Sequence, residues 1–319
     1  MDDRVHAPGS PFHAGELAVQ ERVGVREKIA AAGQRMIRDA MPDQHRELFE
    51  KLPTIVVGSL DAARRPWASM LAGLPGFVRT PDAHTMVVGA RPQAGDPLAE
   101  HLAVGAPLGL LGIEPHTRRR NRMNGTVLVA EADGFRVGVE QSFGNCPKYI
   151  QAREPQWVQV TEPAPMQALG PSLNDAARAL IARADTLFIA SASAEAPGRA
   201  GAQGVDVSHR GGLPGFVRTE QQDGGCVLTL PDYLGNFMFN TLGNLMAHPV
   251  AGLLFIDPAN GDLLQLSGHT QIVWDGPALA AFEGAQRLVR LTVDSARWRP
   301  GALPLRWSAP QFAPQFVPR

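Results

Sequence analysis

The chain has 319 residues, 44% of them hydrophobic and 19% charged, a composition that predicts a soluble globular protein long enough for two ordinary domains. Its 30 basic and 31 acidic residues give a formal net charge of -1, so we expect no partnership with nucleic acid or with a membrane surface. The N-terminus lacks the apolar segment of a signal peptide, and the longest weakly polar run, Leu102 to Ile113, is too short to span a bilayer.

The N-terminal region, residues 1–47, is predicted to be a helical arm. Apolar residues recur at helical spacing between residues 14 and 40, which indicates one or two helices. A short amphipathic helix from Asp43 to Leu52 then leads into an apolar strand from Thr54 to Ser59.

An exact repeat follows this strand. Residues 73–80, Gly-Leu-Pro-Gly-Phe-Val-Arg-Thr, occur again unchanged at residues 212–219, which is 139 positions later. Residues 108–114 are echoed by residues 251–257 at an offset of 143. The simplest interpretation is two tandem copies of one domain of roughly 100 residues. The groove between the copies is then the first place to look for a ligand.

Each copy is predicted to be an antiparallel barrel with one crossing helix. We expect an opening strand, a strand that ends at the Gly-Leu-Pro-Gly turn, a Phe-Val-Arg strand, a third strand after the turn, a helix and two further strands. The turn itself is a scaffold element, because it needs glycine at positive φ and proline at fixed φ. In the second copy Ser172 with Asp175 is a capping signal for a helix through Leu180, and the strand Thr186 to Ser191 follows.

The predicted fold class is therefore mainly β, with two tandem antiparallel split barrels and an N-terminal helical arm. The first barrel is assigned to residues 48–155 and the second to residues 172–295. A linker at residues 156–171 contains three prolines, which should stop regular structure. Pro277 to Gln286 is expected to be helical, and Leu288 to Val293 is expected to be a strand. The tail, residues 296–319, should be irregular from Ala309 onward.

Signatures of common enzyme classes are missing from the sequence: it has no P-loop, no Gly-x-Gly-x-x-Gly, no His-Glu-x-x-His and no Gly-x-Ser-x-Gly. The 9 histidines form no His-x-His or His-x-x-x-His pair, so no dedicated metal site is expected. Cys146 and Cys226 stand outside any Cys-x-x-Cys pair, and we expect reduced thiols and a cytoplasmic location.

The two copies differ most just ahead of the repeated octapeptide. Trp67 to Ala72 in the first copy stands where the second has Asp206 to Gly211. Ser208, His209 and Arg210 place a hydroxyl, an imidazole and a guanidinium on one strand, a set suited to an anionic or heteroaromatic ligand. A helix expected to begin near Asn236 would offer free backbone N–H groups as a phosphate seat.

These residues carry a resemblance to a known family. The segment 206–217, Pro231-Asp232-x-x-Gly235-Asn236 and Asn244-Leu245 resemble the pyridoxamine 5'-phosphate oxidase-like, FMN-binding split-barrel family, above all its longer members, which sometimes continue into a flavin and iron–sulfur reductase module. Residues 12–16 and 143–150 resemble the first half of that subgroup. The resemblance implies six-stranded split barrels with FMN bound where two barrels meet. The cofactor-binding residues it implies are Asp206, Val207, Ser208, His209, Arg210, Pro231, Asn236, Thr241 and Asn244.

One departure from the family concerns the phosphate. Relatives often carry a basic residue directly after the Gly-Asn pair, whereas Phe237 and Met238 follow Asn236 here. Either Arg210 with another arginine supplies the charge, or FMN affinity is reduced or lost. The run Arg118 to Arg122 is one source of arginine, and it is otherwise a solvated face. Cys146 is either a small packing residue or a reactive thiol.

Two functions remain open from the sequence. The first is an FMN-dependent oxidoreductase that exchanges electrons with a small-molecule or protein redox partner, its substrate unknown; His209 is the candidate proton donor because its ordinary pKa is near neutral. The second is a non-catalytic flavin- or haem-binding, sensory protein that acts through partners. Both a monomer and a homodimer are compatible with a duplicated barrel.

Overall fold

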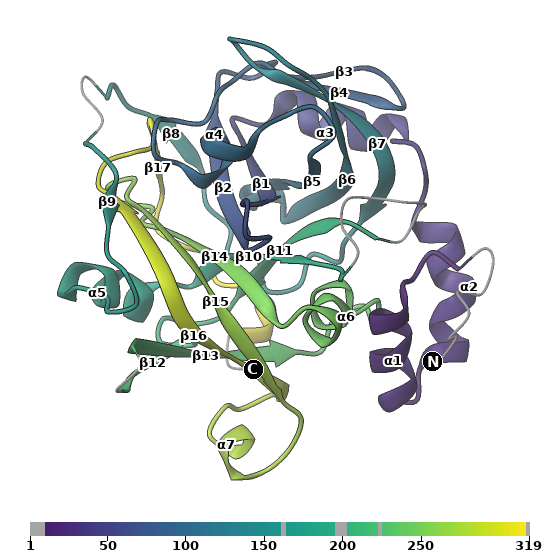
Figure 1. Ribbon diagram of the computed structural model, residues 1–319, viewed down its shortest axis with the longest axis vertical. Helices are drawn as coiled ribbons and strands as arrows, with labels where there is room; N and C mark the ends of the chain where they lie inside the picture. Colours follow the sequence, from purple (N-terminus) through teal and green to yellow (C-terminus); the bar gives the residue numbers. More distant parts are fainter. Residues whose placement is uncertain (1–9, 161–163, 195–202, 223–224, 317–319) are drawn as a thin grey trace.

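Two antiparallel sheets and an N-terminal set of helices make up the fold (Figure 1). The structure, a computed structural model, describes residues 10–160, 164–194, 203–222 and 225–316. It confirms the predicted fold class, because most of the regular structure is β and both large sheets are antiparallel. No helix within these ranges is long and apolar enough to cross a membrane.

The first sheet has the strand order β2-β1-β5-β6-β7-β4-β3. Its strands are β1 (Thr54–Leu60), β2 (Pro66–Ala72), β3 (Val78–Asp82), β4 (Thr85–Val88), β5 (Pro107–Glu114), β6 (Arg119–Ala130) and β7 (Phe135–Gly144). The short helix α4 (Pro97–His101) connects β4 to β5. The sheet thus has one strand more than the six expected, because β7 lies between β6 and β4.

The second sheet has the strand order β11-β10-β14-β15-β16-β13-β12. Its strands are β10 (Thr186–Ala192), β11 (Val205–Gly211), β12 (Arg218–Gln222), β13 (Gly225–Tyr233), β14 (Val250–Ile256), β15 (Leu263–Val273) and β16 (Ala285–Arg299). Helix α5 (Asp175–Arg183) precedes β10, α6 (Asn240–Ala247) connects β13 to β14, and α7 (Pro277–Ala280) precedes β16. With β10 set equal to β1, the two sheets have the same strand order.

The strand registers make this equivalence exact at the level of residues. The third residue of β1, Val56, pairs with Met70 and Leu111, and the third residue of β10, Phe188, pairs with His209 and Leu254. Positions in one sheet can therefore be compared directly with positions in the other.

The sheets pack against each other through strands that come too close for side chains. A Cβ atom on Gly109 in β5 would lie 2.6 Å from the Val205 carbonyl oxygen. At the equivalent place in β14, a Cβ on Gly252 would lie 2.4 Å from the Pro66 carbonyl oxygen. Only glycine allows this approach.

The repeated octapeptide forms the same turn twice. Gly76 and Gly215 have φ of 93° and 86°, so the prediction of glycine at positive φ is confirmed at both places. Each turn joins the second strand of its sheet to the third.

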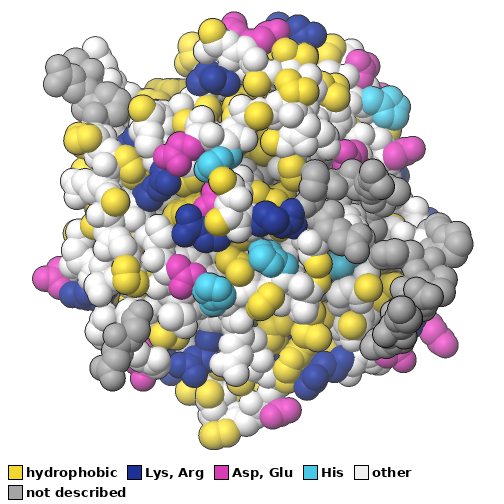
Figure 2. All heavy atoms as spheres, in the orientation of Figure 1, with side chains coloured by type: hydrophobic (Ala, Val, Ile, Leu, Met, Phe, Trp, Pro, Cys, Tyr) yellow, Lys and Arg dark blue, Asp and Glu magenta, His cyan; other side chains and the backbone are white. Residues whose placement is uncertain are grey.

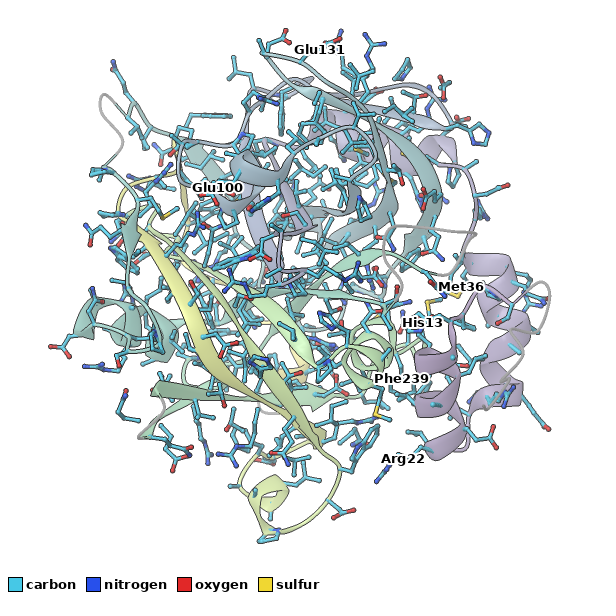
Figure 3. All side chains as sticks on the ribbon, in the orientation of Figure 1. His13, Arg22, Met36, Glu100, Glu131 and Phe239 are labelled. Atoms are coloured by element: carbon cyan, nitrogen blue, oxygen red, sulfur yellow. The ribbon has the colours of Figure 1, made fainter. Side chains whose placement is uncertain are left out.

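The N-terminal arm consists of α1 (Ala14–Arg22), α2 (Arg26–Met36) and α3 (Asp43–Lys51), as the sequence predicts. Helix α1 lies beside α6, and Figure 3 shows His13 and Phe239 in this region. The contact is close, since a Cβ on Gly15 would lie 2.1 Å from the Gly243 carbonyl oxygen. His13 and Glu16 form a capping box at the start of α1, and Val19 is buried in the core of the second sheet.

Several predicted details are wrong. The side chain that caps α5 is Asn174, which accepts from Ala177 N at 2.8 Å, and not Ser172. Helix α7 ends at Ala280 instead of Gln286, because β16 begins at Ala285. The predicted strand Leu288 to Val293 is longer than expected, since β16 runs from Ala285 to Arg299 inside the second sheet, between β15 and β13.

The linker and the tail also hold regular structure. Strand β8 (Pro155–Trp157) pairs with β17 (Leu305–Trp307), and β9 (Gln167–Ala168) pairs with β16. The prolines of the linker flank these short strands, while Pro163 lies outside the described residues. Strand β16 ends at Arg299, beyond residue 295, where the sequence predicts the end of the second barrel. The domain boundaries remain predictions.

Charged side chains of both signs are interspersed on the face shown in Figure 2, as the near-neutral net charge leads one to expect.

Candidate functional site

A cavity of about 100 Å³ lies at the junction of the two sheets, and we call it the arginine cavity. Arg120 and Arg122 reach it from β6 of the first sheet, and Arg210 reaches it from β11 of the second. The other lining residues are Leu111, Asn145, Cys146, Tyr149, Ser208, His209, Gly211, Pro231, Asp232, Tyr233, Gly235, Asn236, Phe237, Phe239, Asn240, Thr241 and Leu242. Neither half of the chain could form this cavity alone.

The surroundings of Arg120 disfavour its positive charge. Burial, together with the charges of Arg210 and Arg122, lowers the pKa of its guanidinium to about 10, against the opposing effect of Cys146. Its Nη1 lies 2.8 Å from His209 Nδ1, and its Nε is buried without a hydrogen-bond partner among the described residues. A buried, repelled cation with an unused donor is a site where an anion would be stabilised.

Arg122 is engaged within the protein. Its guanidinium forms an ion pair with Asp206 and donates to Asn240 Oδ1 at 3.1 Å. Asn124 Nδ2 also donates to Asp206 Oδ1, at 2.8 Å. The carboxylate of Asp206 therefore holds β6 of the first sheet against β11 of the second, and its role here is structural.

Arg210 belongs to a second ionic group. Its Nη1 lies 3.0 Å from Asp232 Oδ1, while Arg287 Nε lies 3.3 Å from the other carboxylate oxygen. Burial lowers the pKa of Arg287, and the nearby charge of Arg210 adds to that effect. Two guanidiniums thus share one carboxylate, which leaves this side of the cavity with an excess of positive charge.

The start of α6 faces the same cavity. The residue before the helix, Phe239, has the left-handed φ of 61°, and no described side chain caps the helix. The first three helical residues, Asn240, Thr241 and Leu242, all line the cavity. Uncapped backbone N–H groups of a helix start attract anions, so this end complements the arginines.

The imidazole of His209 is held in one neutral form. Burial, with Arg120 and Arg210 nearby, lowers its pKa well below the ordinary value. Because a guanidinium can only donate, Nδ1 must accept from Arg120, and the ring proton therefore sits on Nε2. A ring in this state is neither an acid at neutral pH nor a ready metal ligand through Nε2.

Aromatic rings line the more open part of the cavity. Tyr149 and Tyr233, both half-buried, stack with their ring centroids 5.3 Å apart, and Tyr149 Oη donates to Leu234 O at 3.0 Å. Tyr149, Phe237 and Phe239 have φ of 67°, 63° and 61°, a region that non-glycine residues rarely adopt. Such strain gathered around one cavity is typical of functional sites, and these rings could stack on a planar ligand.

Of the residues implied to bind a cofactor, the structure brings Ser208, His209, Arg210, Pro231, Asn236 and Thr241 together around the arginine cavity. The other three lie elsewhere. Asp206 pairs with Arg122, and Val207 is fully buried in the core between the sheets. Asn244 is also buried; its Oδ1 lies 2.9 Å from His13 Nε2, and its Nδ2 donates to Ser191 Oγ at 3.0 Å.

The start of α6 also differs from the prediction. The helix begins at Asn240, and Asn236 lies in the preceding loop, where its Oδ1 accepts from Met238 N at 3.2 Å. The left-handed conformation of Phe237 and Phe239 keeps this loop out of the helix.

The sequence analysis did not identify three aromatic residues of the site, Tyr149, Tyr233 and Phe239. It also did not indicate that Arg120 lies close to the second sheet. One signal was present, because the two-residue period of a strand puts Arg120 and Arg122 on the same face of β6. No local pattern marks the aromatic residues, since they come together only in the folded chain.

The donor set fits a phosphate group of a cofactor such as FMN. Arg120, Arg210 and the N–H groups of α6 supply positive charge from three directions. The cavity of about 100 Å³ is smaller than the roughly 300–1,000 Å³ of pockets for drug-sized ligands, so it would hold the phosphate of such a cofactor, and Tyr149 and Tyr233 would offer aromatic surface to its ring. Among the described residues, no group of three or more His, Cys, Asp and Glu is placed to hold a metal ion.

The equivalent place in the first sheet is filled by the protein itself. Asp96 caps α4 where α6 has no cap, and its buried carboxylate accepts from Leu98 N at 2.9 Å and from Ser69 Oγ at 2.5 Å. Gln265, which is equivalent to Arg122, donates to Asp96 Oδ2 at 3.2 Å. An internal carboxylate thus occupies the position that is open to an external anion in the second sheet.

No family model matches the chain, and no curated protein matches it. Among solved structures, the chain is similar to HupZ of Group A Streptococcus, at 12% identity over 39% of this chain and 91% of that one, with a TM-score of 0.30. A pyridoxamine 5'-phosphate oxidase-related, FMN binding protein of Nostoc punctiforme matches at 12% identity over 45% of this chain and 100% of that one, with a TM-score of 0.25. HutZ, the heme storage protein of Vibrio cholerae, matches at 14% identity over 44% and 96%, with a TM-score of 0.23. Similarities this weak assign no function.

Proposed function

We propose that the chain is a flavoprotein that binds FMN in the arginine cavity. The observation that carries this proposal is the meeting of Arg120, Arg210 and the uncapped start of α6 around one buried space. Arg120 and Arg210 supply the basic charge that Phe237 and Met238 cannot.

Each part of the site has a role in this proposal. Arg120, Arg210 and the N–H groups of Asn240 and Thr241 hold the phosphate. Tyr149 and Tyr233, which stack on each other, would offer aromatic surface to the planar ring. When bound, FMN supplies the electron-transfer chemistry, and the protein supplies position and polarity.

An oxidoreductase reaction with a small-molecule or protein redox partner is the activity we propose for this site. The second candidate is a non-catalytic flavin carrier or sensor. It is favoured by the state of His209, the candidate proton donor, because burial with Arg120 and Arg210 nearby lowers the pKa of its ring well below the ordinary value. A haem ligand is less compatible with the cavity, because His209 would first have to give up its contact with Arg120.

FMN titration of the purified chain tests the binding. We expect a saturable change in flavin absorbance, and Arg120→Met should weaken FMN binding by about 10- to 100-fold, the value of a lost hydrogen bond to a charged group. Arg119→Met is the matched control, because Arg119 is exposed on the same strand and outside the cavity. A chain that never binds FMN, or equal losses in both variants, would rule the proposal out. Reduction of bound flavin by NADH or NADPH then separates the enzyme from the carrier.

The number of bound flavins gives an independent prediction. We expect one FMN per chain, because Asp96, Gln265 and Ser69 close the equivalent place in the first sheet. Isothermal titration calorimetry measures this ratio directly. A ratio of two would show that the internal carboxylate can be displaced and that our account of the first sheet is wrong.

The shared strand order of the two sheets supports tandem duplication as the origin of the chain, together with the repeated octapeptide. Duplication also explains why the junction between two similar halves forms one complete site within a single chain. A cytoplasmic location remains an expectation from the cysteines, and the redox partner remains to be identified.

A further inference from the structure

A larger cavity of about 440 Å³ lies at the same junction, on the other side of His209. We call it the apolar cavity, and equivalent positions of the two sheets line it in pairs. Its lining includes Thr54 with Thr186, Met70 with His209, Ile113 with Ile256, Glu114 with Asp257 and Pro115 with Pro258. The cavity therefore follows the approximate twofold relation between the sheets, and its size is that of a small-molecule pocket.

The walls of this cavity are mostly hydrophobic. Met70, Ile113, Ile150 and Phe188 belong to the core cluster between the sheets, and they form its inner surface. Trp157 and Trp307 line it from the paired strands β8 and β17. A space of this size bounded by apolar side chains favours a ligand that replaces water with apolar contact.

The charged residues at its rim neutralise one another. Lys51 Nζ lies 2.8 Å from Glu114 Oε1, and the equivalent residues in the second half, Arg183 and Asp257, form the equivalent ion pair. A third pair joins Arg153 Nη2 to Asp185 Oδ2 at 2.7 Å. Because each rim charge has a partner of opposite sign, the cavity provides no net charge for an ionic ligand.

One buried polar group distinguishes the two ends of the cavity. The position filled by Met70 in the first sheet is filled by His209 in the second. Since Nδ1 of His209 accepts from Arg120, the ring proton is on Nε2, which is the hydrogen-bond donor that this lining residue can offer a ligand. A ligand with a hydrogen-bond acceptor would satisfy this donor.

We propose that the apolar cavity binds a neutral, largely apolar small molecule that carries a hydrogen-bond acceptor. The inference rests on this cavity alone and holds whether or not the arginine cavity binds FMN. Because His209 lines both cavities, the bound molecule would share this residue with the arginine cavity.

The test uses the full chain and Nile red, a neutral, flat dye with a carbonyl acceptor whose emission reports an apolar environment. We expect saturable binding of one dye per chain with blue-shifted emission. Ala259→Trp places a bulky ring at an exposed residue of the cavity lining and should weaken dye binding about tenfold. The matched control is Ala31→Trp on the exposed side of α2, which should leave binding unchanged.

A second variant tests the proposed donor. His209→Phe keeps the ring but removes Nε2–H, and it should weaken Nile red binding about fivefold. Saturating FMN or inorganic phosphate should not displace the dye, because these anions belong in the arginine cavity. Absence of saturable binding, equal effects of the two tryptophan variants, or displacement by FMN would each overturn the proposal.

Discussion

Replacing Arg122 by methionine is expected to lower the free energy of unfolding by about 3–5 kcal/mol, the cost of leaving a buried carboxylate without its partner. Asp206 is 8% exposed, and after the substitution only Asn124 would still donate to its carboxylate. The pair also joins the two sheets, so its loss should weaken their junction as well as the local strands.

Urea denaturation followed by circular dichroism measures the effect. Arg119→Met should change stability by no more than about 0.5 kcal/mol, because Arg119 is an exposed residue of the same strand. Adding Asp206→Asn to Arg122→Met should recover part of the loss, since the unpaired charge is then removed. A double variant as unstable as the sum of the two single ones would show that the ion pair does not act as a unit.

Substituting Gly15 by alanine should destabilise the protein by about 1–3 kcal/mol through overpacking. The new Cβ would lie 2.1 Å from the Gly243 carbonyl oxygen, so α1 and α6 would have to separate. Helix propensity alone predicts the opposite sign, because alanine is favoured over glycine within a helix by roughly 1 kcal/mol. Destabilisation would therefore report the helix contact directly.

Thermal unfolding and limited proteolysis of the arm provide the two readouts for Gly15→Ala. Gly144→Ala is a suitable control, since its new Cβ would lie 3.6 Å from Asn121 Oδ1, which is an ordinary van der Waals contact. Faster cleavage of the arm in Gly15→Ala but not in the control is the expected result. Equal stability of all three proteins would mean that α1 and α6 can shift at no cost.

The sequence revealed those elements whose residues carry a local signal. The octapeptide required the same turn twice, because Gly76 and Gly215 need positive φ, and the apolar strands β1 and β10 follow from their composition. The extent of α7 could not be predicted this way, since residues 281–286 are compatible with a helix and the pairing of β16 with β13 takes Ala285 into the sheet.

The candidate site shows the same division. Ser208, Arg210 and Thr241 were found because their motif is local, and they line the arginine cavity. The run that contains Arg120 could be interpreted from the sequence either as a source of phosphate-binding arginines or as a solvated face. Nothing near Arg120 in the chain indicates that His209, 89 residues away, lies within hydrogen-bond distance. The family resemblance assigns Asn244 to the cofactor, whereas in the folded chain its side chain contacts His13 and Ser191.

The place of α1 has a consequence for the order in which the chain can fold. This helix comes first in the sequence, yet it packs on α6. The hydrogen bond between its N-cap residue His13 and Asn244 of α6 spans 231 residues. Until the second sheet has formed, Glu16 and Val19 of α1 have no folded surface against which they can be buried. Helix α1 must therefore dock late, and a fragment that ends after the first sheet would keep that face of α1 exposed and prone to aggregation.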